Sequence, residues 1–272
     1  MAENVTIKKL GKTPLDPISV GRQYYSELRV YVKEIKDLIE LYLVPEVSTL
    51  LTNAGYNRPS TDSQKSRQDG YGQDIEEIID QIRDLFGTQY TEVEIAAMAS
   101  KYATLTELFN QKQFEKSLGG SPDFGLSLAR STAFVSDELQ AFTLENIKLI
   151  KSIEAKYLED VQGIVTRGVQ RGGLVKDIQK DIRSRYGVTK NRAKLIARDQ
   201  TAKFNSTLTR LKQESVGVQL YQWSTSLDGR VRDSHSANEG RVFSWNNPPS
   251  TGHPGEDVAC RCVAIPILEF EE

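Results

Sequence analysis

The sequence is poor in cysteine, histidine, methionine and tryptophan, with two of each among 272 residues. Cys260 and Cys262 are separated by one residue, so they cannot build a framework of several disulfide bonds. Such scarcity is typical of proteins made in a reducing compartment. The small, disulfide-stapled secreted class is therefore excluded.

Long hydrophobic runs are also lacking. No stretch approaches the roughly 18 consecutive apolar residues that a membrane-spanning helix needs, and the first residues, MAENVTIKKLGKTPLDP, lack the apolar core of a secretion signal. We therefore expect a soluble protein with no membrane among its partners.

A strong net charge is missing, since 35 Lys and Arg residues face 37 Asp and Glu residues, for a formal charge of -2. The charges are nevertheless segregated: acidic residues crowd 74–94 and basic residues crowd 167–212. The hydrophobic fraction of 38% is low beside the 26% of charged residues, which favours a protein with much surface or one that relies on partners.

The basic segment is a candidate DNA-binding strip. A row of Lys and Arg side chains neutralises phosphates without reading sequence; the alternative interpretation is a helix face that only meets water. The residues that would contact DNA are Arg167, Arg171, Lys176, Lys180, Arg183, Arg185, Lys190, Arg192, Lys194, Arg198 and Lys203.

Apolar residues recur at steps of three and four along most of the chain, the spacing of helices that bury one face. Thr91 and Glu94 have the capping-box spacing at the start of one such helix. Gly187 is expected to make a tight turn between the last two helices, with Thr189 as the next N-cap; the pair fits two packed helices as well as a helix-turn-helix. The predicted helices span 22–53 with a kink at Pro45, 73–87, 91–118, 136–165, 172–187 and 189–214.

After Gly217 the hydrophobic period changes to two, which predicts strands over 218–224, 241–245 and 262–267. The expected fold class is α+β: an elongated, mainly helical N-terminal body followed by a small mixed C-terminal domain with a short β-sheet. The expected parts are an extended arm over 1–20 that orders on a neighbouring subunit, a helical domain over 21–165 and a C-terminal domain over 166–272.

The C-terminal domain contains four donors suited to a metal, His235, His253, Cys260 and Cys262. Imidazole nitrogens and thiolates are the ligands that Zn²⁺ prefers, and four of them make a closed structural site. A C-x-C pair is an uncommon spacing for such a site. The alternative is that the cysteines pack as small buried hydrophobic residues and His253 is a loop residue.

A catalytic interpretation of the same region is also chemically conceivable. His235 as a base, with Arg232 and Asp228 beside it, suits hydrolysis or transfer on a phosphate ester. The sequence has no Gly-rich phosphate loop and no H-E-x-x-H. We favour a turn at Asp228 with Arg230 and Arg232 paired to Asp233, Glu239 or Asp257, so we do not expect an enzyme.

The C-terminal part of the chain contains, in order, the motifs W-x4-D-G-R-V-R-x-x-H, G-R-V-F-x-W, P-P, P-G-E-D and C-R-C-V-A-x-P. In this order they resemble the C-terminal domain of phage head morphogenesis proteins related to phage Mu protein F. The preceding helix, Ile182 to Asn205, is similar to the helix that leads into that domain, so the resemblance covers roughly 165–268. Some members have a C-P-x-C pair where residues 232–235 stand here, which is a departure from their pattern. The motif residues are Trp223, Asp228, Arg230, Arg232, Asp233, Arg241, Asp257 and Arg261.

The resemblance implies a minor head (capsid) protein of a tailed bacteriophage. Such a protein associates with the portal protein inside the head during procapsid assembly, meets the major capsid or scaffolding protein, and contacts the packaged phage DNA. It would be found in the virion, in the head interior near the portal, and in the host cytoplasm during assembly. The alternative function is a metal- or His-dependent phosphoesterase or nuclease.

Overall fold

The computed structural model describes residues 6–55, 70–118 and 135–271. Two connections that the sequence predicts lie mostly outside these residues: the polar, turn-rich segment 55–72, which is typical of a loop, and the G-G-S-P-D sequence after Leu118, which is typical of a turn. Helices predominate and the strands are few, so the α+β class with a short sheet near the C-terminus is confirmed.

The chain divides into two compact units, each assembled from segments that are far apart in sequence. Unit 1 comprises 1–24, 97–146 and 195–272, and unit 2 comprises 25–96 and 147–194. The division into 1–20, 21–165 and 166–272 concerned consecutive stretches and stays a prediction.

Unit 2 consists of helices. Its residues come from α1 (Ile18–Leu38), a π-helix η1 (Ile39–Leu43), α2 (Val47–Asn53), α3 (Tyr71–Gln89), the start of α4 (Glu92–Ser117), most of α6 (Val135–Gln170) and the first half of α7 (Val175–Ser215). Tyr31, Phe86 and Tyr90 form an aromatic cluster with ring centroids 4.7–4.8 Å apart. Apolar stripes at helical spacing meet in the core of this unit, as binary patterning requires.

The predicted interruption at Pro45 is confirmed. Proline has no N–H to donate and clashes with the preceding turn, so a regular α-helix does not pass through it. Here α1 widens into η1 and the chain resumes as α2 at Val47. The Val44 carbonyl, directly after η1, accepts a hydrogen bond of 3.0 Å from Gln179 Nε2.

The capping box is confirmed at the start of α4. Thr91 N donates to Glu94 Oε2 at 2.8 Å, and Glu94 N donates to Thr91 Oγ1 at 3.4 Å. These reciprocal bonds satisfy two backbone donors that the first turn of the helix leaves free.

The turn predicted at Gly187 is wrong, because α7 runs without a break from Val175 to Ser215. Thr189 is no N-cap; its hydroxyl donates back to Arg185 O at 3.2 Å, as in a helix interior. A glycine costs a helix only about 1 kcal/mol, and the buried side chains of Ile182 and Ala193 on either side outweigh that cost. With one helix instead of two, the helix-turn-helix interpretation falls as well.

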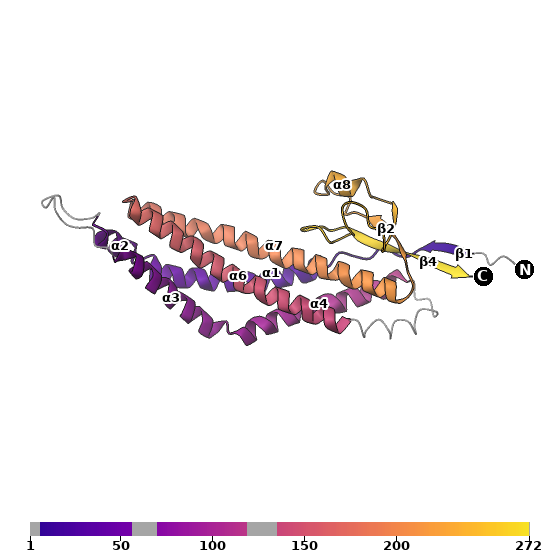
Figure 1. Cartoon of the computed structure of the whole chain (residues 1–272), viewed down its shortest axis with the longest axis horizontal. Coiled ribbons are helices and arrows are strands. Elements are labelled where there is room, and N and C mark those ends of the chain that lie inside the picture. Colours follow the sequence, from indigo (N-terminus) through magenta and orange to yellow (C-terminus); the bar gives the residue numbers. More distant parts are fainter. Residues whose placement is uncertain (1–5, 56–69, 119–134, 272) are drawn as a thin grey trace, which may run out of the picture. The chain divides into compact units, whose positions relative to one another are not determined.

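Unit 1 contains a four-stranded sheet with the order β1-β4-β2-β3. The strands are β1 (Thr6–Leu10), β2 (Leu220–Ser224), β3 (Val242–Ser244) and β4 (Val263–Glu271), all antiparallel to their neighbours. The first half of β4 pairs with β2, and its second half pairs with β1 (Figure 1). Residues 6–10 of the predicted arm therefore pair with a strand of their own chain, where we expected a neighbouring subunit.

Among the described residues, three clusters of buried side chains contribute to the core of unit 1. One lies among the helices, around Phe142 and Phe204, whose rings stack at 4.3 Å. A second joins helix to sheet through Phe114 and Leu268. The third belongs to the C-terminal loops and strands and is described below.

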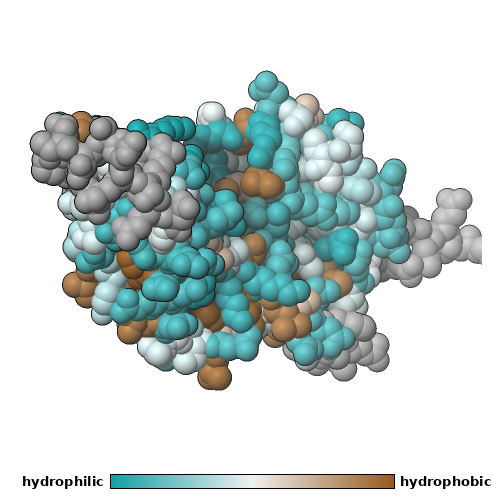
Figure 2. All heavy atoms as spheres, turned by 60° about the vertical axis from the view of Figure 1, so that its left-hand side comes forward, coloured by the Kyte–Doolittle hydropathy of each residue, from teal (hydrophilic) through white to brown (hydrophobic). Residues whose placement is uncertain are grey.

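Among the described helices, none is both long and apolar enough to cross a bilayer. Figure 2 shows a face on which hydrophilic residues predominate and hydrophobic ones occur in small groups. Scattered exposed apolar residues of this kind are normal for a water-facing surface.

Candidate functional site

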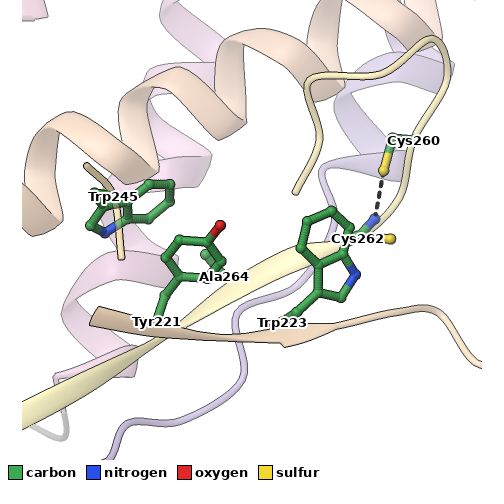
Figure 3. Close-up of a cluster of buried hydrophobic side chains, with 6 residues drawn as sticks. All are labelled: Tyr221, Trp223, Trp245, Cys260, Cys262 and Ala264. Carbon is green, nitrogen blue, oxygen red and sulfur yellow. Dashed lines mark hydrogen bonds between the residues drawn. The ribbon is translucent and has the colours of Figure 1, made fainter. Parts of the chain in front are cut away.

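The site is built on the aromatic face of β2. Tyr221 and Trp223 alternate with partly exposed residues, so both rings point to the same buried side of the strand (Figure 3). Ala264 of β4 lies opposite Trp223 in the register. Cys260 and Cys262 complete this end of the cluster, where the last loop enters β4.

His235 lies on the short helix α8 (Asp233–Ser236) and is 2% exposed. Its Nδ1 is 3.4 Å from Cys260 Sγ and 3.5 Å from Cys262 Sγ. The three ligand atoms all lie within 4.8 Å of one another. The imidazole stands edge-on to the Trp223 ring, with centroids 5.4 Å apart, so the aromatic cluster fixes its orientation.

The second nitrogen of His235 faces a carboxylate. His235 Nε2 is 3.4 Å from Asp257 Oδ2, and Arg232 pairs with the same oxygen at 3.2 Å. Arg232 also donates to Val258 O at 2.7 Å. A carboxylate on Nε2 favours the tautomer that carries its proton there, which leaves the Nδ1 lone pair directed at the sulfurs.

The pKa values of the two thiols are shifted in opposite directions. The hydrogen bond from Cys262 lowers the pKa of the Cys260 thiol below its ordinary value. The hydrogen bond to Cys260, together with burial, raises the pKa of Cys262. The pair therefore holds one thiolate more readily than two in the absence of a cation.

The cysteines are brought together by α7. Arg198 Nη2 donates to Ala259 O at 2.8 Å, and Ala259 N donates to Asp199 Oδ1 at 2.7 Å. Ala259 has φ +53°, a left-handed conformation that a non-glycine residue adopts at a cost. These two bonds hold the residue before Cys260 in that conformation. We did not predict them from the sequence. The available signal was the A-R-D motif at 197–199, which lies in the helix that is part of the resemblance.

His253 does not join this group, so the expected set of four ligands is not assembled. Its Nδ1 is 2.9 Å from the Tyr221 hydroxyl, and its ring centroid is 4.9 Å from that of Trp245. Burial lowers the pKa of His253 below its ordinary value. The structure thus brings three of the predicted donors together and places the fourth elsewhere in the aromatic cluster.

The remaining motif residues hold the loops. Arg261 donates two hydrogen bonds of 2.6 Å to Asp228, and they lower the pKa of that carboxyl. Arg230 pairs with Asp228 as well, at 3.2 Å, where Asp233, Glu239 or Asp257 was predicted. The predicted pair of Arg232 with Asp257 is present.

Asp233 is the first residue of α8, whose N-terminus favours a negative side chain. Arg241 lies over the Phe243 ring at 5.3 Å, and its carbonyl accepts from Trp223 N at 2.8 Å.

Asp16 is a further member of this region that the sequence did not indicate. Burial raises its pKa to about 6, although Arg261 and Arg198 act in the opposite direction. The segment after β1 therefore contributes a carboxyl group close to the two arginines that hold the loops.

The predicted DNA-contacting residues are not all free to meet a phosphate. Arg183 pairs with Glu40 at 3.1 Å, Arg185 pairs with Asp160, and Lys203 pairs with Asp199 at 3.0 Å. Arg198 donates a hydrogen bond to the Ala259 carbonyl. The exposed members are Arg167, Arg171, Lys176, Lys180, Arg183, Arg192, Lys194 and Arg198.

Helical geometry divides the strip further. At about 100° per residue, Lys176, Lys180 and Lys194 share one side of α7, whereas Arg185 and Arg192 lie on roughly the opposite side. Lys190 lies over the Tyr186 ring at 5.6 Å. One row of lysines, and not the whole strip, presents a single face within unit 2.

Residues 159–265 match the family model described as Phage Mu protein F like protein. This part of the chain is therefore similar to a family of phage proteins, which confirms the resemblance found in the motifs. A segment of 144 residues is 45% identical to an uncharacterized protein of Haemophilus influenzae. It covers 53% of this chain and 32% of that relative, so the chain spans about a third of the length of the protein it matches. No solved structure matches.

Proposed function

We propose that the protein is a minor head protein of a tailed bacteriophage, which binds the portal protein inside the head during procapsid assembly. The observation that carries the proposal is the match to the phage Mu protein F-like family over 159–265. This stretch contains α7, the C-terminal loops with their motif residues, and the start of β4.

The contacts of the motif side chains support a non-enzymatic role. A phosphoesterase built on Asp228, Arg232 and His235 needs a free base and a free anion clamp. His235 is buried between two sulfurs and a carboxylate, Asp228 is held by Arg261, and Arg232 is engaged with Asp257. Each group holds another part of the loops, which is what a docking or assembly module requires.

Contact with packaged DNA is part of the proposal. The support is the row of exposed lysines on α7, which neutralises phosphates without reading bases. Major capsid or scaffolding protein is the further partner that a location inside the head implies.

The test is co-expression of the full chain with the portal and major capsid proteins of the same phage, followed by isolation of the particles. We expect the chain to co-purify with particles in a low copy number and to resist added protease until the shell is opened. Particles assembled without portal protein should lack it.

Two results contradict the proposal. If particles of unchanged composition and maturation form without the chain, it is not a head assembly protein. If the chain is digested on intact particles, or enters them equally well without portal, the location inside the head at the portal is wrong.

A further inference from the structure

We propose that His235, Cys260 and Cys262 form a zinc site whose fourth coordination position opens into a small pocket beside them. This inference does not depend on the proposed function. It rests on the positions of the three donors, on the groups that orient them and on the pocket.

The separations fit a tetrahedral ion. Zn–S bonds of about 2.3 Å and Zn–N bonds of about 2.0–2.1 Å place neighbouring sulfur and nitrogen ligands about 3.5 Å apart. The observed Nδ1 to Sγ distances are 3.4 Å and 3.5 Å. His235 Nδ1 therefore already lies at the separation from both sulfurs that a shared Zn²⁺ ion requires.

The orientation of His235 fits as well. Asp257 beside Nε2 gives the carboxylate–histidine arrangement that fixes the tautomer of metal-binding imidazoles. Arg232 in turn pairs with Asp257 and donates to Val258 O. The ligand nitrogen thus points at the sulfurs because a second layer of contacts holds the ring.

The backbone before Cys260 also directs a donor toward the proposed ion. In a regular strand the C-x-C spacing places both side chains on one face, but Cys260 precedes β4. The left-handed Ala259, held by Arg198 and Asp199, turns Cys260 toward Cys262.

The pocket borders all three donors. Besides His235, Cys260 and Cys262, its lining includes Ser226, Arg230 and Arg232. No fourth Cys, His, Asp or Glu joins the group among the described residues. A water molecule or an anion favoured by the arginines therefore takes the fourth position. Imidazole and thiolate together favour Zn²⁺ over Mg²⁺ or Ca²⁺, which take oxygen ligands.

The experiment is metal analysis of the full-length protein purified under reducing conditions, without chelator and after reconstitution with Zn²⁺. We expect about one zinc ion per chain. Co²⁺ in its place should give the thiolate-to-cobalt charge-transfer band of a site with sulfur ligands. His235→Gln, Cys260→Ser and Cys262→Ser should lose both signals.

The matched control is His253→Gln, which removes the other histidine of the same cluster and should keep full metal content. Variants are compared as folded monodisperse protein. If the cysteine variants do not fold, the wild type is stripped of metal with a chelator and titrated with Co²⁺, and the charge-transfer band then shows whether the site binds metal through sulfur. No zinc and no cobalt band in the reduced wild type overturns the proposal, as does a Cys260–Cys262 disulfide found without metal. Loss of the ion in His253→Gln would overturn the three-residue site in favour of four ligands.

Discussion

At the scale of single residues, Ala259 shows how the fold prepares a local geometry. Its left-handed backbone costs free energy, of the order of 1 kcal/mol for a residue with a side chain. The bonds to Arg198 and Asp199 offset that cost. Because Cys260 follows directly, the strained backbone lies where it sets the direction of the Cys260 side chain.

The buried His253 predicts a pH-dependent stability. Burial lowers its pKa, while Glu256 and Glu214 act to raise it and Arg210 to lower it. The unfolded chain therefore binds a proton at this position more readily than the folded one. The stabilising contribution is complete above the ordinary histidine pKa of about 6.5 and is lost as the pH falls below it.

The measurement is the free energy of unfolding of wild type and His253→Gln between about pH 8 and pH 5, compared at each pH. Gln keeps a polar partner for the Tyr221 hydroxyl. We expect the wild type to lose more stability on acidification than the variant. Parallel curves would mean that His253 is protonated equally in both states and that its burial has no such effect.

At the scale of elements, α7 offers the sharpest test of the revised helix. A side-chain carbon added at Gly187 meets nothing within 4 Å. Because alanine favours a helix interior, Gly187→Ala should raise the free energy of unfolding by about 0.5–1 kcal/mol in denaturant titrations. A turn at Gly187 would require glycine and give the opposite sign.

Gly168 in α6 is the control. A carbon added there would lie 2.6 Å from Ile178 Cγ1, so Gly168→Ala should destabilise the protein although it too lies in a helix. Equal losses of stability in the two variants would contradict the continuous helix.

Local patterns predicted most of the helices because each buries one stripe of its own residues. The capping box and the break at Pro45 also depend only on neighbours in sequence. The pairing of β1 with β4 joins residues at opposite ends of the chain, such as Thr6 and Glu271. No periodicity within residues 6–10 identifies that partner.

At the scale of the whole molecule, the net charge is near zero although α7 carries a row of exposed lysines, Lys176, Lys180 and Lys194. Binding to double-stranded DNA should weaken with salt, because each neutralised phosphate releases counterions. Replacing Lys176, Lys180 and Lys194 by Gln should reduce the slope of log affinity against log salt by about 2–3. Fluorescence anisotropy at several salt concentrations measures it.

The control makes the same change of charge at lysines that already pair with acids, Lys33, Lys151 and Lys156. It should leave the slope almost unchanged. An equal effect of both triple variants would mean that only net charge matters, and absence of binding at low salt would remove DNA from the proposed partners.

The sequence by itself determined the α+β class, the main helices, the strands near the C-terminus and the resemblance to a phage protein family, because these depend on periodicity and on short ordered motifs. Only the tertiary structure decided which donors converge. Three donors meet, His235, Cys260 and Cys262, because α7 holds Ala259 and Trp223 of β2 packs against the imidazole. The ring of His253 instead lies within hydrogen-bond distance of the Tyr221 hydroxyl. Convergence of side chains is set by long-range contacts, and these leave no periodic trace in the segments that they join.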